Sequence, residues 1–317
     1  MSQHRRLGRS DLMVSKLCLG GNVFGWTADE AVSLRLLDQF ADAGLNFVDT
    51  ADVYSRWIPG HVGGESETLI GKWLQTQGQR DKLVIATKVG SDMGPRRKGL
   101  SSRWIAEAVE ESLRRLQTDY IDLYQSHFDD VETPFEETLA AYSTLIRAGK
   151  VRAIGASNLT AARLTQALEV SAKTGLPRYE CLQPHYNLSE RTKFEGALEA
   201  LCVANGLGVI PYYGLAGGFL TGKYRSKADL TLSPRGAGAE KYLNEQGLKI
   251  LAALDEVAAG HAATPGQVAL AWLMARPSIT APIASASNPD QLSELIGSTR
   301  LELSALDMEQ LNRASAA

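Results

Sequence analysis

The sequence predicts an α/β fold, a closed (β/α)₈ TIM barrel preceded by a short N-terminal β-hairpin. Short apolar runs typical of buried strands recur along the chain, and amphipathic stretches typical of helices lie between them. Eight such units fit in roughly 280 residues, which is the usual size of this barrel. The competing fold, a doubly wound open sheet, would carry a Gly-x-Gly-x-x-Gly turn after an early strand. The first turn, Gly20 to Gly25, lacks that spacing.

The elements of the barrel follow in order along the chain. Residues 4–17 alternate around a turn at residues 8–11 and are expected to form the hairpin. The strands are expected at residues 17–20, 45–49, 83–88, 121–126, 151–156, 180–183, 208–213 and 279–284. The helices are expected at residues 28–43, 64–77, 101–117, 134–148, 160–174, 191–205, 245–275 (broken at Thr264-Pro265) and 289–297. No linker divides these units, so we expect one domain over residues 1–317.

Two segments are longer than ordinary connections. Residues 55–64 follow the second strand, and residues 224–244 follow the seventh. Loops that follow barrel strands emerge at the C-terminal face, where the active sites of such barrels are built. We therefore expect both segments to be walls or lids of a pocket.

The composition argues against several classes of partner. The 317 residues include 33 Lys and Arg against 36 Asp and Glu, and the net charge of -3 gives no support for a nucleic-acid or membrane surface. The N-terminus lacks an apolar signal segment, and no stretch is long enough to cross a bilayer, so we expect a cytoplasmic protein. The 3 cysteines lie far apart, as in proteins of a reducing compartment, and the 5 histidines form no metal-binding motif.

Four polar residues lie at the ends of neighbouring strands of the predicted barrel. Asp49 ends the second strand and Tyr54 follows it, Lys88 ends the third strand, and His127 comes just after the fourth. Taken singly, Lys88 has the ordinary interpretation of a lysine reaching water, and His127 that of a packing residue. Considered together, the four residues favour a functional site instead, because adjacent barrel strands lie about 4.8 Å apart and their ends converge on one small volume. A buried carboxylate needs a nearby cation, and Lys88 is the candidate partner of Asp49.

This group of residues has a definite chemical use. An ammonium group favours the ionised form of a nearby phenol, so we expect the pKa of Tyr54 to fall below its usual value of about 10. Tyr54 would then donate a proton to the alkoxide that develops from a carbonyl group. Asp49 would fix and compensate Lys88, while His127 would donate a hydrogen bond to the same substrate oxygen. None of these residues supplies a hydride, so a cofactor is required.

Six short blocks occur in order at the ends of the predicted strands: Phe47 to Tyr54, Ala86 to Lys88, Asp119 to His127, Gly155 to Asn158, Gln183 to Asn187 and Gly217 to Tyr224. With these blocks the sequence resembles the aldo-keto reductase family, in the bacterial branch related to potassium-channel β subunits, from the hairpin to about residue 297. The resemblance implies a (β/α)₈ barrel that uses NADPH. It also implies a catalytic tetrad of Asp49, Tyr54, Lys88 and His127.

The resemblance assigns cofactor-binding residues in the second half of the chain. Ser157, Asn158 and Gln183 would hold the carboxamide of the nicotinamide, and Tyr212 would stack on its ring. A hydroxyl and two amides suit a neutral carboxamide, and an aromatic face suits a flat ring. From local sequence alone, Ser157 and Asn158 have an alternative interpretation as an ordinary helix cap.

A glycine-rich loop follows the seventh strand. Gly217 to Lys223 nearly matches a Walker A loop, but Tyr224 stands where that motif needs Ser or Thr. The resemblance instead places the loop over the cofactor pyrophosphate, with Lys223 as a phosphate contact. The other positions that it assigns to the cofactor are Gly21, Asn22, Gly214, Leu215, Ser285, Ser287 and Gln291, of which the last three surround the adenosine ribose and its phosphate.

The sequence departs from the family pattern at two places. Tyr213 and Gly214 stand where relatives often have Ser-Pro. No Lys or Arg lies between Arg276 and Arg300, although relatives often carry Arg near Ser287. A 2′-phosphate would then depend on hydroxyl groups and a helix N-terminus, so NADH is an alternative to NADPH.

Aromatic residues on the loops suggest where a substrate lies. Phe24, Trp26, Trp57 and Phe128 follow the first, second and fourth strands and could form an apolar wall beside the carbonyl site; ordinary loop packing is the alternative. No basic cluster demands a phosphorylated or carboxylated substrate. We expect a small-molecule carbonyl or alcohol, and no feature of the sequence selects the compound, the direction of reaction or an oligomeric state.

Three functions are compatible with these residues. The first is an NAD(P)H-dependent reductase of aldehydes or ketones that also runs as an alcohol dehydrogenase. The second is a Schiff-base lyase or aldolase, because a lysine at a strand end can present a nucleophilic amine, although Asp49 would keep Lys88 charged. The third is a nicotinamide-binding regulatory module with little turnover, against which the intact tetrad argues.

Overall fold

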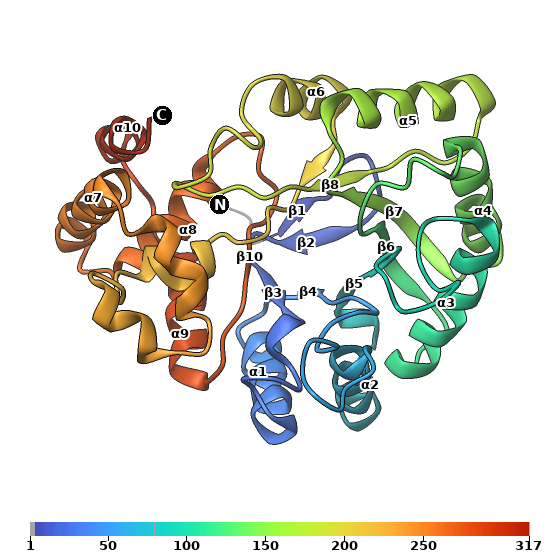
Figure 1. Ribbon diagram of the computed structural model, residues 1–317, viewed down its shortest axis with the longest axis horizontal. Coiled ribbons are helices and arrows are strands. Elements are labelled where there is room, and N and C mark those ends of the chain that lie inside the picture. Colours follow the sequence, from blue (N-terminus) through green and yellow to red (C-terminus); the bar gives the residue numbers. More distant parts are fainter. Residues whose placement is uncertain (1–3, 79, 317) are drawn as a thin grey trace.

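The computed structural model describes residues 4–78 and 80–316 (Figure 1). Its main sheet has eight parallel strands in the order β10-β3-β4-β5-β6-β7-β8-β9. They are β3 (Cys18–Gly20), β4 (Phe47–Asp49), β5 (Val84–Val89), β6 (Ile121–Ser126), β7 (Val151–Ser157), β8 (Cys181–Gln183), β9 (Gly208–Val209) and β10 (Ile283–Ala284). The sheet closes because Thr280 N donates to Val209 O and Ile283 N donates to Pro211 O, each at 2.8 Å. The predicted barrel is confirmed.

Helices surround the strands (Figure 1). They are α1 (Glu30–Asp42), α2 (Glu65–Gln77), α3 (Ser102–Leu116), α4 (Phe135–Arg147), α5 (Ala161–Thr174), α6 (Ala197–Asn205), α7 (Glu245–His261), α8 (Pro265–Ala275), α9 (Pro289–Ser298) and α10 (Ala305–Ala314). The predicted break before Pro265 is confirmed: Thr264 caps α8 in a capping box with Gln267. Helix α10 was not predicted, although Ser304 and Asp307 form a similar capping box that the sequence displays.

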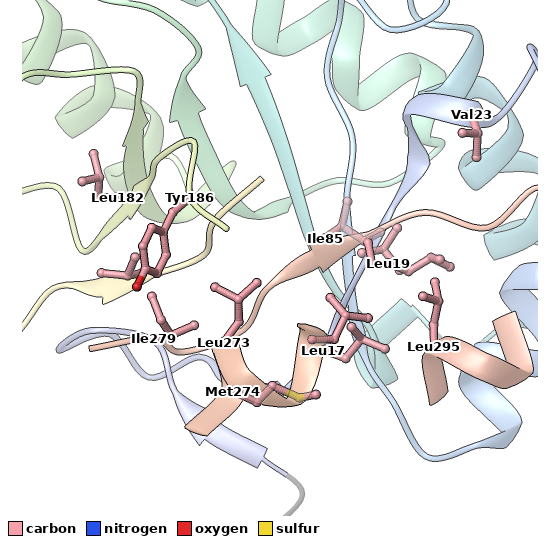
Figure 2. Close-up of a cluster of buried hydrophobic side chains, with 14 of the residues drawn as sticks. Leu17, Leu19, Val23, Ile85, Leu182, Tyr186, Leu273, Met274, Ile279 and Leu295 are labelled. Atoms are coloured by element: carbon pink, nitrogen blue, oxygen red, sulfur yellow. The ribbon is translucent and has the colours of Figure 1, made fainter. Parts of the chain in front are cut away.

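Alternation along the strands separates two cores. Residues such as Phe47 and Leu123 face the barrel interior, whereas Leu19 and Ile85 face outward to the helices. Figure 2 shows this outer layer, in which Leu19 and Ile85 lie in one buried cluster with Leu273 of α8. Apolar side chains fill the N-terminal end of the barrel interior, and polar side chains lie at the C-terminal ends of the strands.

The hairpin closes the N-terminal end of the barrel. Strands β1 (His4–Arg6) and β2 (Met13–Ser15) pair antiparallel, as predicted. Leu7, Leu12 and Val14 pack into the interior cluster with Phe47. Gly8 has φ +59°, and a Cβ there would lie 2.1 Å from the Glu180 carbonyl oxygen, so this turn accepts only glycine. The open end of the barrel is therefore the C-terminal end.

Several predicted boundaries were wrong for identifiable reasons. The seventh and eighth strands were predicted over six residues each but are cut short near Pro211 and Pro282, which have no N–H to donate to a sheet. Helix α6 begins at Ala197 rather than residue 191, after Gly196 at φ +92°. The long segment after β9 contains three short 3₁₀ helices, η3 (Ala216–Thr221), η4 (Lys227–Leu232) and η5 (Gly236–Tyr242).

Candidate active site

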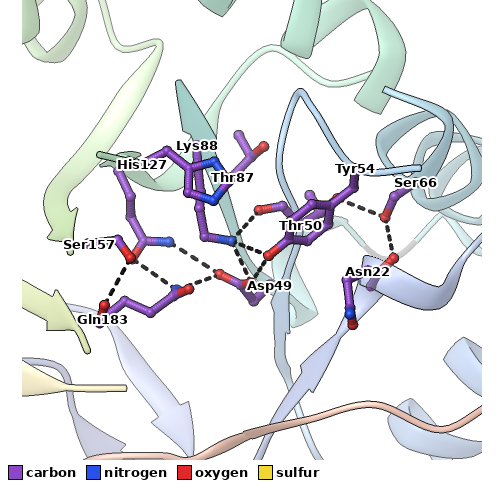
Figure 3. Close-up of polar contacts among 12 residues, drawn as sticks. Asn22, Asp49, Thr50, Tyr54, Ser66, Thr87, Lys88, His127, Ser157 and Gln183 are labelled. Carbon is purple, nitrogen blue, oxygen red and sulfur yellow. Dashed lines mark hydrogen bonds and ion pairs between the residues drawn. The ribbon is translucent and has the colours of Figure 1, made fainter. Parts of the chain in front are cut away.

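Asp49 and Lys88 form a buried ion pair at the C-terminal ends of β4 and β5. Lys88 Nζ lies 2.6 Å from Asp49 Oδ2, and both side chains are almost fully buried (Figure 3). Lys88 also donates to the carbonyl oxygen of Thr50 and to the phenol oxygen of Tyr54, each at 2.8 Å. With three acceptors for its three protons, Lys88 is held as an ammonium group.

The loop after β4 brings Tyr54 back over this ion pair. Tyr54 N donates to Ala51 O, and the buried hydroxyl of Ser55 donates to Phe24 O at 2.7 Å, so the loop is anchored on both sides of the tyrosine. The Tyr54 hydroxyl donates to Asp49 Oδ2 at 3.3 Å. Tyr54, Lys88 and Asp49 therefore contact one another, as Figure 3 shows.

The predicted direction of the Tyr54 pKa shift was wrong. Burial and then the Asp49 carboxylate raise the pKa of Tyr54 well above its usual value of 10.0. The prediction considered the Lys88 cation alone, whereas Asp49 neutralises that cation at 2.6 Å and also accepts the phenol proton in a hydrogen bond. In the resting protein Tyr54 thus keeps its proton at neutral pH, as a proton donor must.

His127 follows β6 and lies beside Tyr54. Its backbone N donates to Val89 O at 2.8 Å, its ring meets the Tyr54 ring edge to face with centroids 6.1 Å apart, and its Nδ1 is 2.9 Å from Ser91 Oγ. Burial and the Lys88 charge lower the pKa of His127 well below 6.5, so the imidazole is neutral. The tautomer in which Ser91 donates to Nδ1 carries the ring proton on Nε2, from which it can be donated to a substrate oxygen.

Two glutamine amides hold the second oxygen of Asp49. Gln183 Nε2 donates to Asp49 Oδ1 at 2.9 Å, and Gln125 Nε2 donates to the same oxygen at 3.2 Å. Gln125 is absent from the sequence prediction. It could have been found, because it lies two residues after inward-facing Leu123 and pairs in register with Lys88.

The residues assigned to the carboxamide lie together on the same face. Asn158 Nδ2 donates to His127 O at 2.9 Å and to Ser157 Oγ at 3.1 Å, while Asn158 Oδ1 accepts from the Tyr212 hydroxyl at 2.8 Å. Ser157 Oγ donates to the Gln183 carbonyl oxygen at 2.8 Å. The helix-cap interpretation of Ser157 and Asn158 was wrong, since Thr160 caps α5.

The glycine-rich loop has a backbone conformation that favours glycine. Gly217 and Gly218 have φ of +69° and +97°, which L side chains rarely adopt, and a Cβ on Gly218 would lie 3.1 Å from Lys223 Cε. Lys223 is exposed, and Leu215 is half-buried at the start of η3. Gly214 is buried, and a Cβ there would lie 3.3 Å from the Ile283 carbonyl oxygen. Bare backbone beside an ammonium group fits the pyrophosphate of a dinucleotide.

The residues assigned to the adenosine end bind one another across the ends of β3 and β10. Ser285 Oγ donates to Asn22 Oδ1 at 2.6 Å, next to Gly21 in the turn after β3. Ser287 N donates to Gln291 Oε1 at 2.8 Å, and Ser287 Oγ lies 2.7 Å from Thr27 Oγ1. Thr27 was not predicted, and no local motif marks it.

Aromatic rings connect the predicted substrate wall to the tetrad. Trp26 and Trp57 meet edge to face at 5.7 Å, Trp57 meets Tyr54 at 6.2 Å, and Phe128 stacks on His127 at 4.7 Å. Trp57 and Phe128 are each 48% exposed, so their rings are available to a ligand.

Phe24, by contrast, is fully buried in the outer core, so its assignment to the substrate wall was wrong. Trp57 belongs to the predicted long loop at residues 55–64. It lines a hollow of about 430 Å³ with Val53, Arg56 and His61.

Residues 4–78 and 80–316 offer neither a metal site nor a membrane-spanning helix. In that part of the chain no three His, Cys, Asp or Glu side chains are grouped so that they could hold a metal ion. In the same residues, no helix combines the length and the apolar character that crossing a membrane requires.

Comparisons with known proteins identify the family that this chain matches. The model of the aldo/keto reductase family matches residues 16–316. The uncharacterized oxidoreductase YrpG of Bacillus subtilis is 37% identical, over 98% of this chain and 95% of the relative. Protein tas of Escherichia coli is 35% identical, over 95% of this chain and 94% of the relative. A probable voltage-gated potassium channel subunit beta of Oryza sativa is 34% identical, over 92% of this chain and 89% of the relative.

Proposed function

This chain belongs to the aldo/keto reductase family, and from that premise we propose that it transfers a hydride from NADPH to an aldehyde or ketone, with Tyr54 as the general acid. Family membership by itself supports nicotinamide-dependent carbonyl reduction by an oxidoreductase. Three points go beyond family membership and are proposed here: Tyr54 as the acid, NADPH as the cofactor, and the assignment to the alcohol dehydrogenases. The reverse reaction, oxidation of the alcohol, uses the same residues.

The observation that carries the proposal is the contact between Lys88 and Tyr54. In reduction, Tyr54 passes its proton to the substrate oxygen, and the phenolate that remains accepts from Lys88 Nζ, which already lies at 2.8 Å. Asp49 keeps Lys88 charged and in place at 2.6 Å. His127 Nε2 donates to the same oxygen and orients the carbonyl group. A bound reduced nicotinamide supplies the hydride.

The described residues fit such a cofactor. Gln183 Oε1 and the Ser157–Asn158 pair would hold the carboxamide, Tyr212 would stack on the ring, and Lys223 would contact the pyrophosphate. Serine hydroxyls and the N-terminus of α9 would hold a 2′-phosphate. We propose NADPH as the cofactor, with NADH as a weaker alternative, since no Lys or Arg lies between Arg276 and Arg300.

The proposal also covers the domain organisation, the cellular compartment and the partner. We propose that residues 1–317 act as one barrel domain and that the protein is cytoplasmic. Three buried, unpaired cysteines, Cys18, Cys181 and Cys202, support a reducing compartment. The partner is a small carbonyl compound or alcohol.

The test is direct. Purified protein is mixed with NADPH and a panel of aliphatic and aromatic aldehydes and ketones, and the absorbance of the reduced nicotinamide is followed. We expect consumption of NADPH that depends on the carbonyl compound. No binding of either nicotinamide cofactor, or no consumption with any member of the panel, would contradict the proposal.

One alternative has a specific observation in its favour. The rice relative bears the name of a channel subunit, so a nicotinamide-binding regulatory role with little turnover is the second candidate. Tight binding of NADPH without turnover on the same panel would favour it. The Schiff-base lyase lacks such support, since three acceptors, one of them the Asp49 carboxylate, engage the Lys88 amine, which is therefore not free to attack a carbonyl group.

A further inference from the structure

Gln125 belongs to a layer of inward-facing residues that crosses the barrel just below the tetrad. Lys88 pairs in register with Gln125, Gln125 with Gly155, and Gly155 with Cys181. Gly155 leaves room for the glutamine, because a Cβ there would lie 3.2 Å from Gln125 Cγ and 2.6 Å from Cys181 Sγ. Gln125 is fully buried, so its amide must find its partners inside the barrel.

The amide of Gln125 is oriented by its neighbours. Its Nε2 donates to Asp49 Oδ1 at 3.2 Å, and its Oε1 accepts from the Cys181 thiol at 3.7 Å and from Gln183 Nε2 at 3.3 Å. Burial raises the pKa of Cys181 well above 9.0, so this thiol keeps its proton and remains a donor. Exchanging the N and O of Gln125 would place two acceptors against each other at Asp49.

Gln183 is oriented in turn by Gln125 and Asp49. One N–H of its Nε2 points to Asp49 Oδ1 at 2.9 Å, and the other points to Gln125 Oε1. A flipped Gln183 amide would bring its oxygen against both of these acceptors, one of them charged, and would lose two hydrogen bonds. Its Oε1 therefore faces away from them, and no residue of the described chain donates a hydrogen bond to it.

We propose that Gln125 is a positioning residue that locks the Gln183 amide with its oxygen toward the nicotinamide. This inference rests on the proposed function. The locked amide presents an acceptor to the cofactor, so it selects the NH₂ group of the nicotinamide carboxamide rather than its carbonyl group. The same lock connects the cofactor site to Asp49, and through Asp49 to Lys88 and Tyr54.

The test compares two oxidised cofactors that differ only at this group. NADP⁺ carries the carboxamide, and its 3-acetylpyridine analogue has a methyl ketone that cannot donate a hydrogen bond. Dissociation constants are measured by isothermal titration calorimetry. We expect the wild-type protein to bind NADP⁺ about tenfold more tightly than the analogue, the usual effect of one buried hydrogen bond. In Gln125→Leu this ratio falls at least threefold, because the Gln183 amide loses one of its two acceptors and can turn.

A double-mutant cycle separates positioning from a general structural effect. In Gln183→Leu the ratio is expected to approach one, and adding Gln125→Leu to it should change the ratio no further. Ser126→Ala is the matched control: Ser126 is the next residue on β6, is buried, and bonds Tyr142 and Tyr179 on the outer side of the strand. It is expected to lower the melting temperature and to leave the ratio unchanged.

The outcomes are distinct. A ratio unchanged in Gln125→Leu, or both ligands weakened equally, overturns the inference and leaves the reductase proposal standing. Failure of the wild-type protein to bind NADP⁺ or NAD⁺ overturns the proposed function itself. Gln125→Met, which keeps the length of the side chain, replaces the leucine variant if circular dichroism shows that the latter is unfolded, and the same ratio decides.

Discussion

Lys88 Nζ lies 2.8 Å from the phenol oxygen of Tyr54 at the open end of the barrel. The contact joins a residue of β5 to a residue of the loop after β4, and Asp49 Oδ2 accepts a hydrogen bond from each of them. In the resting protein burial and Asp49 keep the phenol protonated. When the proton leaves, the ammonium group donates to the phenolate, so the stabilisation increases as the reaction proceeds.

Tyr54→Phe removes the proposed proton donor and keeps the ring. We expect kcat/KM for aldehyde reduction to fall by about a thousandfold, within the usual range for loss of a general acid. Initial rates measure this, and a fluorescence titration should show NADPH affinity within about twofold of wild type. Tyr124→Phe is the control, because the buried Tyr124 hydroxyl has no hydrogen-bond partner among residues 4–78 and 80–316. Equal losses in the two variants would remove Tyr54 from the mechanism.

Asp49→Asn leaves the Lys88 ammonium group buried without its carboxylate. Breaking a buried ion pair on one side destabilises a protein by about 3–5 kcal/mol, and we expect a loss of that order in urea unfolding. The double variant Asp49→Asn with Lys88→Met should regain much of this stability, because no uncompensated charge remains, but should regain no activity. Recovery of activity along with stability would show that the pair has only a structural role.

Asp52 should make the protein less stable as the pH rises. The residue is only 2% exposed, so its carboxyl group is shielded from water. Burial, and then the nearby Glu67 carboxylate, raise the pKa of Asp52 from 3.8 to about 8. Between these values the folded state binds a proton that the unfolded state has released, so stability falls with increasing pH across this window.

Asp52→Asn mimics the neutral acid and should remove that slope. We expect the variant to be more stable than wild type by roughly 2 kcal/mol or more near pH 8, and about equally stable near pH 4. Urea unfolding at intervals between these two pH values measures the difference. A constant difference across the range would mean that Asp52 is ionised in the folded protein.

Gly218→Ala tests the glycine-rich loop. Gly218 has φ +97°, and the added methyl group would press on Lys223 Cε at 3.1 Å, so we expect the loop to shift and NADPH affinity to fall about tenfold or more. Gly149→Ala is the matched control, because Gly149, in the turn between α4 and β7, also has a positive φ (+73°) and no described residue lies within 4 Å of a Cβ at that position. Calorimetric titration compares both variants with wild type. Unchanged affinity in Gly218→Ala would exclude this loop from the cofactor site.

Features that depend on local pattern could be predicted from the sequence. The alternation of apolar runs and amphipathic stretches predicts the barrel, since the residues that must be buried repeat with the periods of strands and helices. Asp49, Lys88 and His127 were found because strand ends in a parallel barrel share one face. The predicted ends of the seventh and eighth strands were less accurate, because Pro211 and Pro282 interrupt the hydrogen-bond ladder while the apolar pattern continues.

Other features depend on neighbours that are distant in the sequence. The sequence pattern places Phe24 on a loop, whereas the structure buries its side chain in the core. Ser157 and Asn158 have the composition of a helix cap, yet Thr160 caps that helix and Asn158 contacts His127 and Tyr212 instead. These outcomes follow from which surfaces pack together, and residue type alone does not specify that.

The sequence by itself determined the order of strands and helices and the kinds of chemical group at each strand end. The tertiary structure alone decided how the barrel closes through Thr280 and Ile283, how Gln125 and Gln183 share the Asp49 carboxylate, and in which direction the pKa of Tyr54 moves. The physical reason is that burial and electrostatic energies sum over all neighbours in space, and for Tyr54 this sum reverses the effect of its most obvious partner.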